Sequence, residues 1–105
     1  MMPRISVGKA ADMPAKTVRQ IVLDTRPPIA LYHLPDGFFA TDDLCSHGEA
    51  SLAEGEIDEG EIVCPFHLGK FDIRSGAATA SPCFEAIKTY PVILGPDGTL
   101  FIELP

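Results

Sequence analysis

Apolar residues recur along the chain in short runs that alternate with polar positions, and turn-forming residues separate the runs. In Leu100–Leu104, residues 100, 102 and 104 would point to one face and residues 101 and 103 to the other, as in a half-buried β-strand. Short runs rich in β-branched and aromatic residues are typical of strands. We predict strands over Arg4–Val7, Val18–Asp24, Ile29–Leu34, Phe38–Thr41, Ile62–Cys64, Lys70–Ile73, Ile87–Val92 and Leu100–Leu104.

Two tripeptides predict hairpin turns between these strands. Pro35-Asp36-Gly37 separates the third run from the fourth, and Pro96-Asp97-Gly98 precedes the last. Proline presets the turn and glycine accepts positive φ. The one helical candidate is a single turn at Lys9–Asp12, which Pro14 ends. We therefore expect an all-β fold of small antiparallel sheets around one core.

The chain of 105 residues is long enough for one domain, which we expect to span residues 1–105. Met1–Ala10 lacks the apolar centre of an export signal, and no stretch reaches the roughly 20 apolar residues of a membrane span. The expectation is a cytoplasmic protein with no membrane partner.

The net charge of −7 argues against a nucleic-acid partner, because such binding relies on Lys and Arg neutralising phosphates. No Lys or Arg lies between Arg26 and Lys70, where nine of the fifteen acids fall. This acidic stretch is either a solvated face or a surface that steers a basic partner. Its acids are Asp36, Asp42, Asp43, Glu49, Glu54, Glu56, Asp58, Glu59 and Glu61.

Two short motifs carry candidate chemistry. Cys45 and His47 form a Cys-x-His step, and Cys64 and His67 form a Cys-x-x-His step. Each motif follows a predicted strand and is followed by glycine, so we interpret each as a tight loop at a sheet edge. Two loops that each provide a thiolate and an imidazole can close a four-ligand site. Zn²⁺ also accepts two Cys and two His, although zinc fingers usually place their histidines together on a helix.

The double motif resembles that of Rieske proteins. The sequence from Phe71-Asp72 to Ile87–Val92 is similar to that of small ferredoxins of bacterial aromatic-ring-hydroxylating dioxygenases. The resemblance covers roughly residues 28 to 104. It implies a Rieske fold with a cluster-binding subdomain formed by two loops at about residues 43–72. It also implies one [2Fe–2S] cluster per chain, with Cys45 and Cys64 on the inner iron and His47 and His67 on the outer iron. Neutral imidazoles in place of two thiolates raise the potential of such a cluster.

The resemblance also suggests which residues surround the cluster. Gly48 and Gly69 would let backbone N–H groups face the sulfides, Phe66 and Leu68 would form an apolar rim, and Pro82 would shield the cluster from water. Rieske proteins of cytochrome complexes carry hydroxyl groups where this chain has Gly69 and Phe71. Fewer hydrogen bonds to sulfur predict a potential at the low end of the family range of about −150 to +300 mV. Imidazole ligation predicts that the potential depends on pH.

The remaining chemistry-bearing residues have simpler interpretations. His33 is expected to be a half-exposed structural residue, and Tyr32 and Tyr90 to be core or sheet residues. Cys83 is expected to be a small buried side chain. With two of three histidines used by the cluster, His33 alone cannot build the iron site of an oxygenase.

The function that the resemblance implies is a monomeric electron carrier, which is not itself an enzyme. It would take single electrons from a flavin-containing NAD(P)H-dependent ferredoxin reductase and pass them to a terminal oxygenase. The alternative is a Rieske-like small subunit or interaction module of a cytoplasmic nitrite reductase. A membrane-anchored respiratory Rieske subunit is not favoured, because the chain shows no anchor and one spare cysteine cannot form an internal disulfide.

Overall fold

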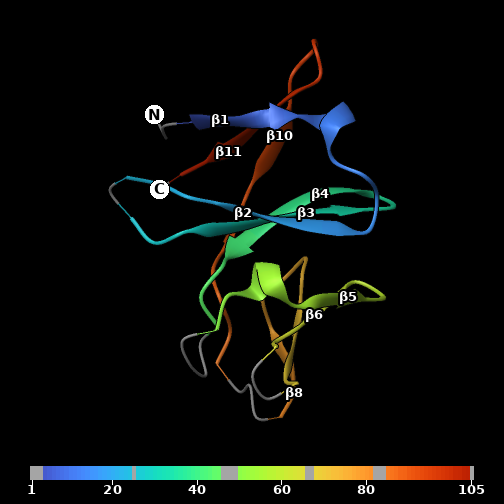
Figure 1. Ribbon diagram of the computed structural model, residues 1–105, viewed down its shortest axis with the longest axis vertical. Helices are drawn as coiled ribbons and strands as arrows, with labels where there is room; N and C mark the ends of the chain where they lie inside the picture. The colour runs from blue at the N-terminus through green and yellow to red at the C-terminus, as the bar shows by residue number, and fades with distance from the viewer. Residues whose placement is uncertain (1–3, 25, 46–49, 66–67, 82–84, 105) are drawn as a thin grey trace.

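The computed structural model describes residues 4–24, 26–45, 50–65, 68–81 and 85–104. Three antiparallel sheets are stacked along the longest axis (Figure 1). The first sheet has the order β1-β11-β10 and lies at one end of the molecule. Its strands are β1 (Arg4–Lys9), β10 (Val92–Leu94) and β11 (Thr99–Glu103).

The second sheet occupies the middle of the stack, and the third lies at the opposite end from the first (Figure 1). The second has the order β2-β3-β4-β9 and comprises β2 (Thr17–Ile21), β3 (Ile29–Leu34), β4 (Gly37–Asp42) and β9 (Thr89–Tyr90). The third has the order β5-β6-β7-β8 and comprises β5 (Glu56–Asp58), β6 (Glu61–Val63), β7 (Lys70–Asp72) and β8 (Ala78–Ala80). All pairings in the three sheets are antiparallel, as predicted.

Strand β3 divides the interior into two cores. It is almost continuously apolar because both of its faces are covered. Ile29 and Leu31 pack into a core shared with the first sheet, whereas Ala30, Tyr32 and Leu34 pack into a core shared with the third. We call the latter the site-side core; its buried residues are Ala30, Tyr32, Leu34, Cys45, Ala50, Leu52, Ile62, Cys64, Phe71, Ile73 and Ile87.

Several sequence predictions are confirmed and others are wrong. The alternation in β11 is real, since Leu100, Ile102 and Leu104 are all buried. The strand predicted over Ile87–Val92 is wrong: β9 and β10 lie in different sheets, because Pro91 between them cannot donate a ladder hydrogen bond. Strands β5 and β8 were not predicted, nor was a 3₁₀ turn at Leu52–Glu54.

The predicted turns are present. Pro35 and Asp36 form a two-residue connection, since Leu34 pairs with Gly37. The predicted helical turn is a 3₁₀ turn at Ala10–Asp12. In the turn before β11, Gly98 adopts φ 86 and donates its N–H to the carbonyl of Gly95 at 3.1 Å.

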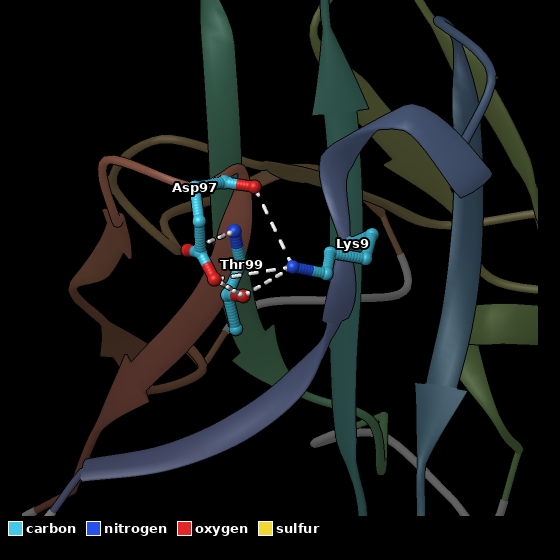
Figure 2. Close-up of polar contacts among 3 residues, drawn as sticks. All are labelled: Lys9, Asp97 and Thr99. Atoms are coloured by element: carbon cyan, nitrogen blue, oxygen red, sulfur yellow. Dashed lines mark hydrogen bonds and ion pairs between the residues drawn. The ribbon is translucent and has the colours of Figure 1, made fainter.

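A lysine from β1 holds the last turn against the first sheet. The Nζ of Lys9 contacts Asp97 Oδ2 at 3.2 Å and Thr99 Oγ1 at 3.0 Å (Figure 2). Asp97 also accepts the backbone N–H of Thr99 at 3.1 Å. The backbone hydrogen bond, followed by the Lys9 ammonium and the Thr99 hydroxyl, lowers the pKa of Asp97 to about 2.

An arginine joins the second and third sheets. Arg74, just after β7, forms a two-pronged ion pair with Asp36 in the β3–β4 turn, at 3.1 and 2.5 Å. Its guanidinium also lies 5.2 Å from the ring centre of Phe39. The pair stabilises the charged form of both partners: the pKa of Asp36 is lowered and that of Arg74 is raised. Both side chains are exposed, so the contact orients the sheets more than it adds stability.

Candidate metal centre

The two cysteines of the predicted motifs lie in the same core and share one local geometry. Cys45 is 2% exposed and Cys64 is 1% exposed. Each donates its backbone N–H to the carbonyl five residues later, Cys45 to Ala50 at 3.0 Å and Cys64 to Gly69 at 2.7 Å. Each therefore stands at the base of a closed loop. Soft sulfur donors, buried together at the bases of two loops, fit one half of the ligand set that a [2Fe–2S] cluster requires.

The first loop begins after β4 of the middle sheet, and its two described arms, residues 43–45 and 50–52, pair with each other. Leu44 and Ser51 form a β-bridge, and Leu52 donates its N–H to the carbonyl of Asp43 at 2.7 Å. Leu52 is fully buried in the site-side core. Both arms are therefore fixed on the same core that holds the two cysteines.

The second loop continues from β6. Leu68 donates its N–H to the carbonyl of Cys64 at 3.0 Å and has φ 61, a conformation that costs a non-glycine residue about 1–2 kcal/mol. Such strain is commonly retained at functional sites. The Leu68 side chain is 69% exposed, and that of Leu44 in the first loop is 50% exposed. An exposed leucine thus neighbours each motif, and the apolar rim expected at Leu68 stays a prediction.

Several predicted site residues lie outside the described residues: the two histidines, His47 and His67, together with Gly48, Phe66 and Pro82. Cys83, which we expected to be a small buried side chain, also lies outside them. Among the described residues, no group of three or more His, Cys, Asp or Glu side chains could hold a metal ion. Gly69 is buried and its carbonyl closes the second loop. The four-ligand set, with its surrounding glycines and Pro82, therefore stays a prediction.

Sequence reasoning missed Asp43, which is 3% exposed. Its Oδ2 accepts hydrogen bonds from Ser51 Oγ at 2.6 Å and Gln20 Nε2 at 2.8 Å, and its Oδ1 accepts the N–H of Ala53 at 2.8 Å. In the sequence Asp43 is one acid among many in the acidic stretch. The only available signal is its place immediately before Leu44-Cys45, at the end of an apolar strand.

The tyrosines and His33 have the structural roles that we expected. Tyr32 is fully buried and its hydroxyl lies 2.8 Å from Thr41 Oγ1; burial raises its pKa, and the Asp43 charge adds to the rise. Burial, followed by the hydrogen bond to Asp42, raises the pKa of Tyr90 to about 12. His33 is half-buried, and its Nδ1 is 2.8 Å from the carbonyl of Met13.

The acidic stretch does not form one uniform surface. Asp36 and Asp58 pair with Arg74 and Lys70, and Asp42, Asp43 and Glu61 accept hydrogen bonds from neighbouring side chains. Glu54, Glu56 and Glu59 are exposed and form no ion pair with a described residue. Among the described acids of the stretch, these three, which we call the β5 acids, are available to a partner.

Comparison with known proteins identifies the family. The pattern of the Rieske [2Fe-2S] domain matches residues 4–91. The ferredoxin component of the p-cumate 2,3-dioxygenase system of Pseudomonas putida is 40% identical over 94 residues, which are 89% of this chain and 79% of the relative. The chain therefore belongs to the Rieske [2Fe–2S] family. It carries one [2Fe–2S] cluster and, like the ferredoxin components that it resembles, is an electron carrier rather than an enzyme.

Solved structures support the same fold. A complex of reduced oxygenase and oxidised ferredoxin in carbazole 1,9a-dioxygenase contains a chain with TM-score 0.92 and 36% identity, covering 95% of this chain and 92% of that one. A structure assigned to the small subunit of an NADH-dependent nitrite reductase from Mycobacterium tuberculosis has TM-score 0.87 at 17% identity, covering 100% and 97%. At that identity the second likeness shows the fold alone. No helix among the described residues is long and apolar enough to cross a membrane.

Proposed function

We propose that Cys45, His47, Cys64 and His67 hold the [2Fe–2S] cluster, and that the protein carries single electrons from a flavin-containing NAD(P)H-dependent reductase to the terminal oxygenase of an aromatic-ring dioxygenase system. The observation that carries this proposal is the burial of Cys45 and Cys64 in one core, each at the base of a loop closed by the same hydrogen bond. When bound, the cluster supplies a centre that accepts and releases one electron.

The chain's own residues keep the sulfur side of this site dry. Leu52, Ile62 and Phe71 are fully buried beside the two cysteines in the site-side core. A core packed in this way excludes water from the thiolates and lowers the local dielectric, both of which tune the potential of an iron–sulfur centre. The cysteine side of the site is thus enclosed by buried apolar side chains.

Exposed side chains beside the two motifs offer a surface for partners. Leu44 and Leu68 are exposed next to the two motifs, and exposed apolar side chains of this kind mark interaction sites when they gather together. The β5 acids lie on the third sheet and its connections, which also contain Cys64. We infer that the leucines contact the partner directly, while the β5 acids accelerate its approach.

Reversing one β5 acid tests the steering role. Glu56→Lys should slow reoxidation of the reduced protein by a purified ring-hydroxylating oxygenase at low ionic strength, by roughly 2- to 10-fold, and the difference should vanish at high salt. Asp24→Lys, the same charge change at an exposed site between β2 and β3, is the matched control and should have a smaller effect. Equal rates for Glu56→Lys and the parent at low salt would contradict the steering role.

The carrier is proposed to work as a cytoplasmic monomer, since each partner must use the same end of the molecule in turn. The oxygenase and its substrate differ among the relatives, which belong to p-cumate and carbazole systems. The alternative, a small subunit of a nitrite reductase, would remain stably bound to its enzyme. Size-exclusion chromatography of the protein mixed with a purified oxygenase, and separately with a purified nitrite reductase, distinguishes the two: a transient carrier elutes apart from both enzymes at micromolar concentration, whereas a subunit co-elutes with the nitrite reductase.

A further inference from the structure

Asp43 is a buried carboxylate that no ligand motif explains. Among the described residues, no lysine or arginine forms an ion pair with it. Its partners are instead three hydrogen-bond donors: the Ser51 hydroxyl, the Gln20 amide and the Ala53 backbone N–H. Three donors on two oxygens fit the ionised form, which only accepts hydrogen bonds. A buried charge satisfied in this way is retained at a cost in solvation, so its position invites a functional explanation.

The three donors come from the parts of the chain that hold the first loop. Ser51 belongs to its returning arm and Ala53 to the 3₁₀ turn that follows this arm, whereas Gln20 belongs to β2 of the middle sheet. Asp43 itself lies on the outgoing arm and accepts the N–H of Leu52 through its backbone carbonyl. The hydrogen bonds of the Asp43 side chain therefore link both arms of the first loop to β2 of the middle sheet.

The carboxylate also lies close to the proposed inner ligand. Asp43 precedes Cys45 by two residues, so their Cα atoms are at most about 7 Å apart. At that range in a buried environment, a fixed negative charge disfavours the addition of an electron, since reduction adds a further negative charge. Replacement by the nearly isosteric asparagine removes the charge and leaves the side-chain volume almost unchanged.

We propose that Asp43 is a positioning residue for the cluster and that its buried negative charge lowers the reduction potential of the centre. This inference rests on the proposed function, because it takes Cys45 as an iron ligand. The positioning role acts through the first loop, and the electrostatic role acts through space. The two roles can be separated, since Ser51 can be changed without removing the charge.

The test uses the cluster-containing protein and three variants: Asp43→Asn, Ser51→Ala and Glu54→Gln. Loss of visible absorbance in the presence of an iron chelator measures cluster release. Asp43→Asn and Ser51→Ala should each accelerate release, roughly tenfold for the loss of one charge-assisted hydrogen bond. Glu54→Gln removes the same unit charge from an exposed site and should release its cluster at the parent rate.

A redox titration then separates charge from structure. Asp43→Asn should move the midpoint to a more positive value, whereas Ser51→Ala and Glu54→Gln should keep the parent midpoint. A cluster-containing Asp43→Asn protein with the parent midpoint would overturn the electrostatic role, and unchanged release from Ser51→Ala would overturn the positioning role. Should Asp43→Asn hold no cluster, faster release from Ser51→Ala supports the proposal and parent-like release rejects it. A parent protein without iron would reject the proposed function instead.

Discussion

Gly55 is the residue at which one added methyl group should do most damage to the site. It follows the 3₁₀ turn at Leu52–Glu54, and its neighbour Glu56 pairs with Val63, the residue before Cys64. A Cβ on Gly55 would lie 1.9 Å from the carbonyl oxygen of Val63, about 1.5 Å closer than ordinary van der Waals contact. Both sides of this contact are backbone, so neither can swing away. Gly55→Ala must therefore separate the returning arm of the first loop from the strand that leads into the second.

The cost should reach the upper end of the range for overpacking, about 3 kcal/mol. For a domain of this size that loss corresponds to a fall in Tm of roughly 12–24 °C, measured by far-ultraviolet circular dichroism. The visible absorbance of the cluster should disappear at a correspondingly lower temperature, because the two cysteine-bearing loops lose their common support.

Gly98→Ala is the matched control. Gly98 has φ 86 but no heavy atom within 4 Å of an added Cβ, so the substitution incurs only backbone strain, about 1–2 kcal/mol. It lies in the first sheet's turn and should not affect cluster retention. The steric reasoning fails if Gly55→Ala unfolds at the parent temperature, or if it retains its cluster as well as Gly98→Ala does.

Two further predictions concern pH. Because the folded pKa of Asp97 is about 2, below its usual 3.8, this carboxylate stabilises the fold above pH 3.8, and the contribution is lost as the pH falls through 2. Asp97→Asn should lower the Tm near neutrality yet converge with the parent near pH 2. Tyr90→Phe should lose about 1 kcal/mol at neutral pH, because it removes the hydrogen bond to Asp42. Since the folded pKa of Tyr90 is raised to about 12, its contribution is present below pH 10, so the penalty should shrink as the pH rises through 12; a penalty that does not change with pH would refute this assignment.

The strands that the sequence predicts well are those with a pattern of their own. Leu100–Leu104 alternates, and Ile29–Leu34 is apolar throughout because the middle sheet is covered on both faces. Strands β5 and β8 have three residues each and little apolar character. They are strands because β6 and β7 offer them hydrogen-bond partners, which is tertiary information that a local pattern does not contain.

The candidate site shows the same difference between residues that a local sequence pattern reveals and residues that only the fold reveals. Cys45 and Cys64 could be predicted as ligands because thiolate and imidazole side chains at a fixed spacing have few other uses. Asp43 could not be identified, since its burial depends on Gln20 and Ser51, which are distant in sequence and meet only in the fold. A charged residue in an acidic stretch is ordinarily solvated, and nothing local distinguishes this one.

Iron and acid-labile sulfide content, together with an EPR spectrum of the dithionite-reduced protein, tests the central claim most directly. We expect two iron and two sulfide per chain and a rhombic EPR signal that appears on reduction. The iron and sulfide, and with them the EPR signal, should be lost after Cys45→Ser or Cys64→Ser. A colourless protein that contains one zinc ion, or an iron centre that persists without either cysteine, would contradict the ligand set on which the function is built.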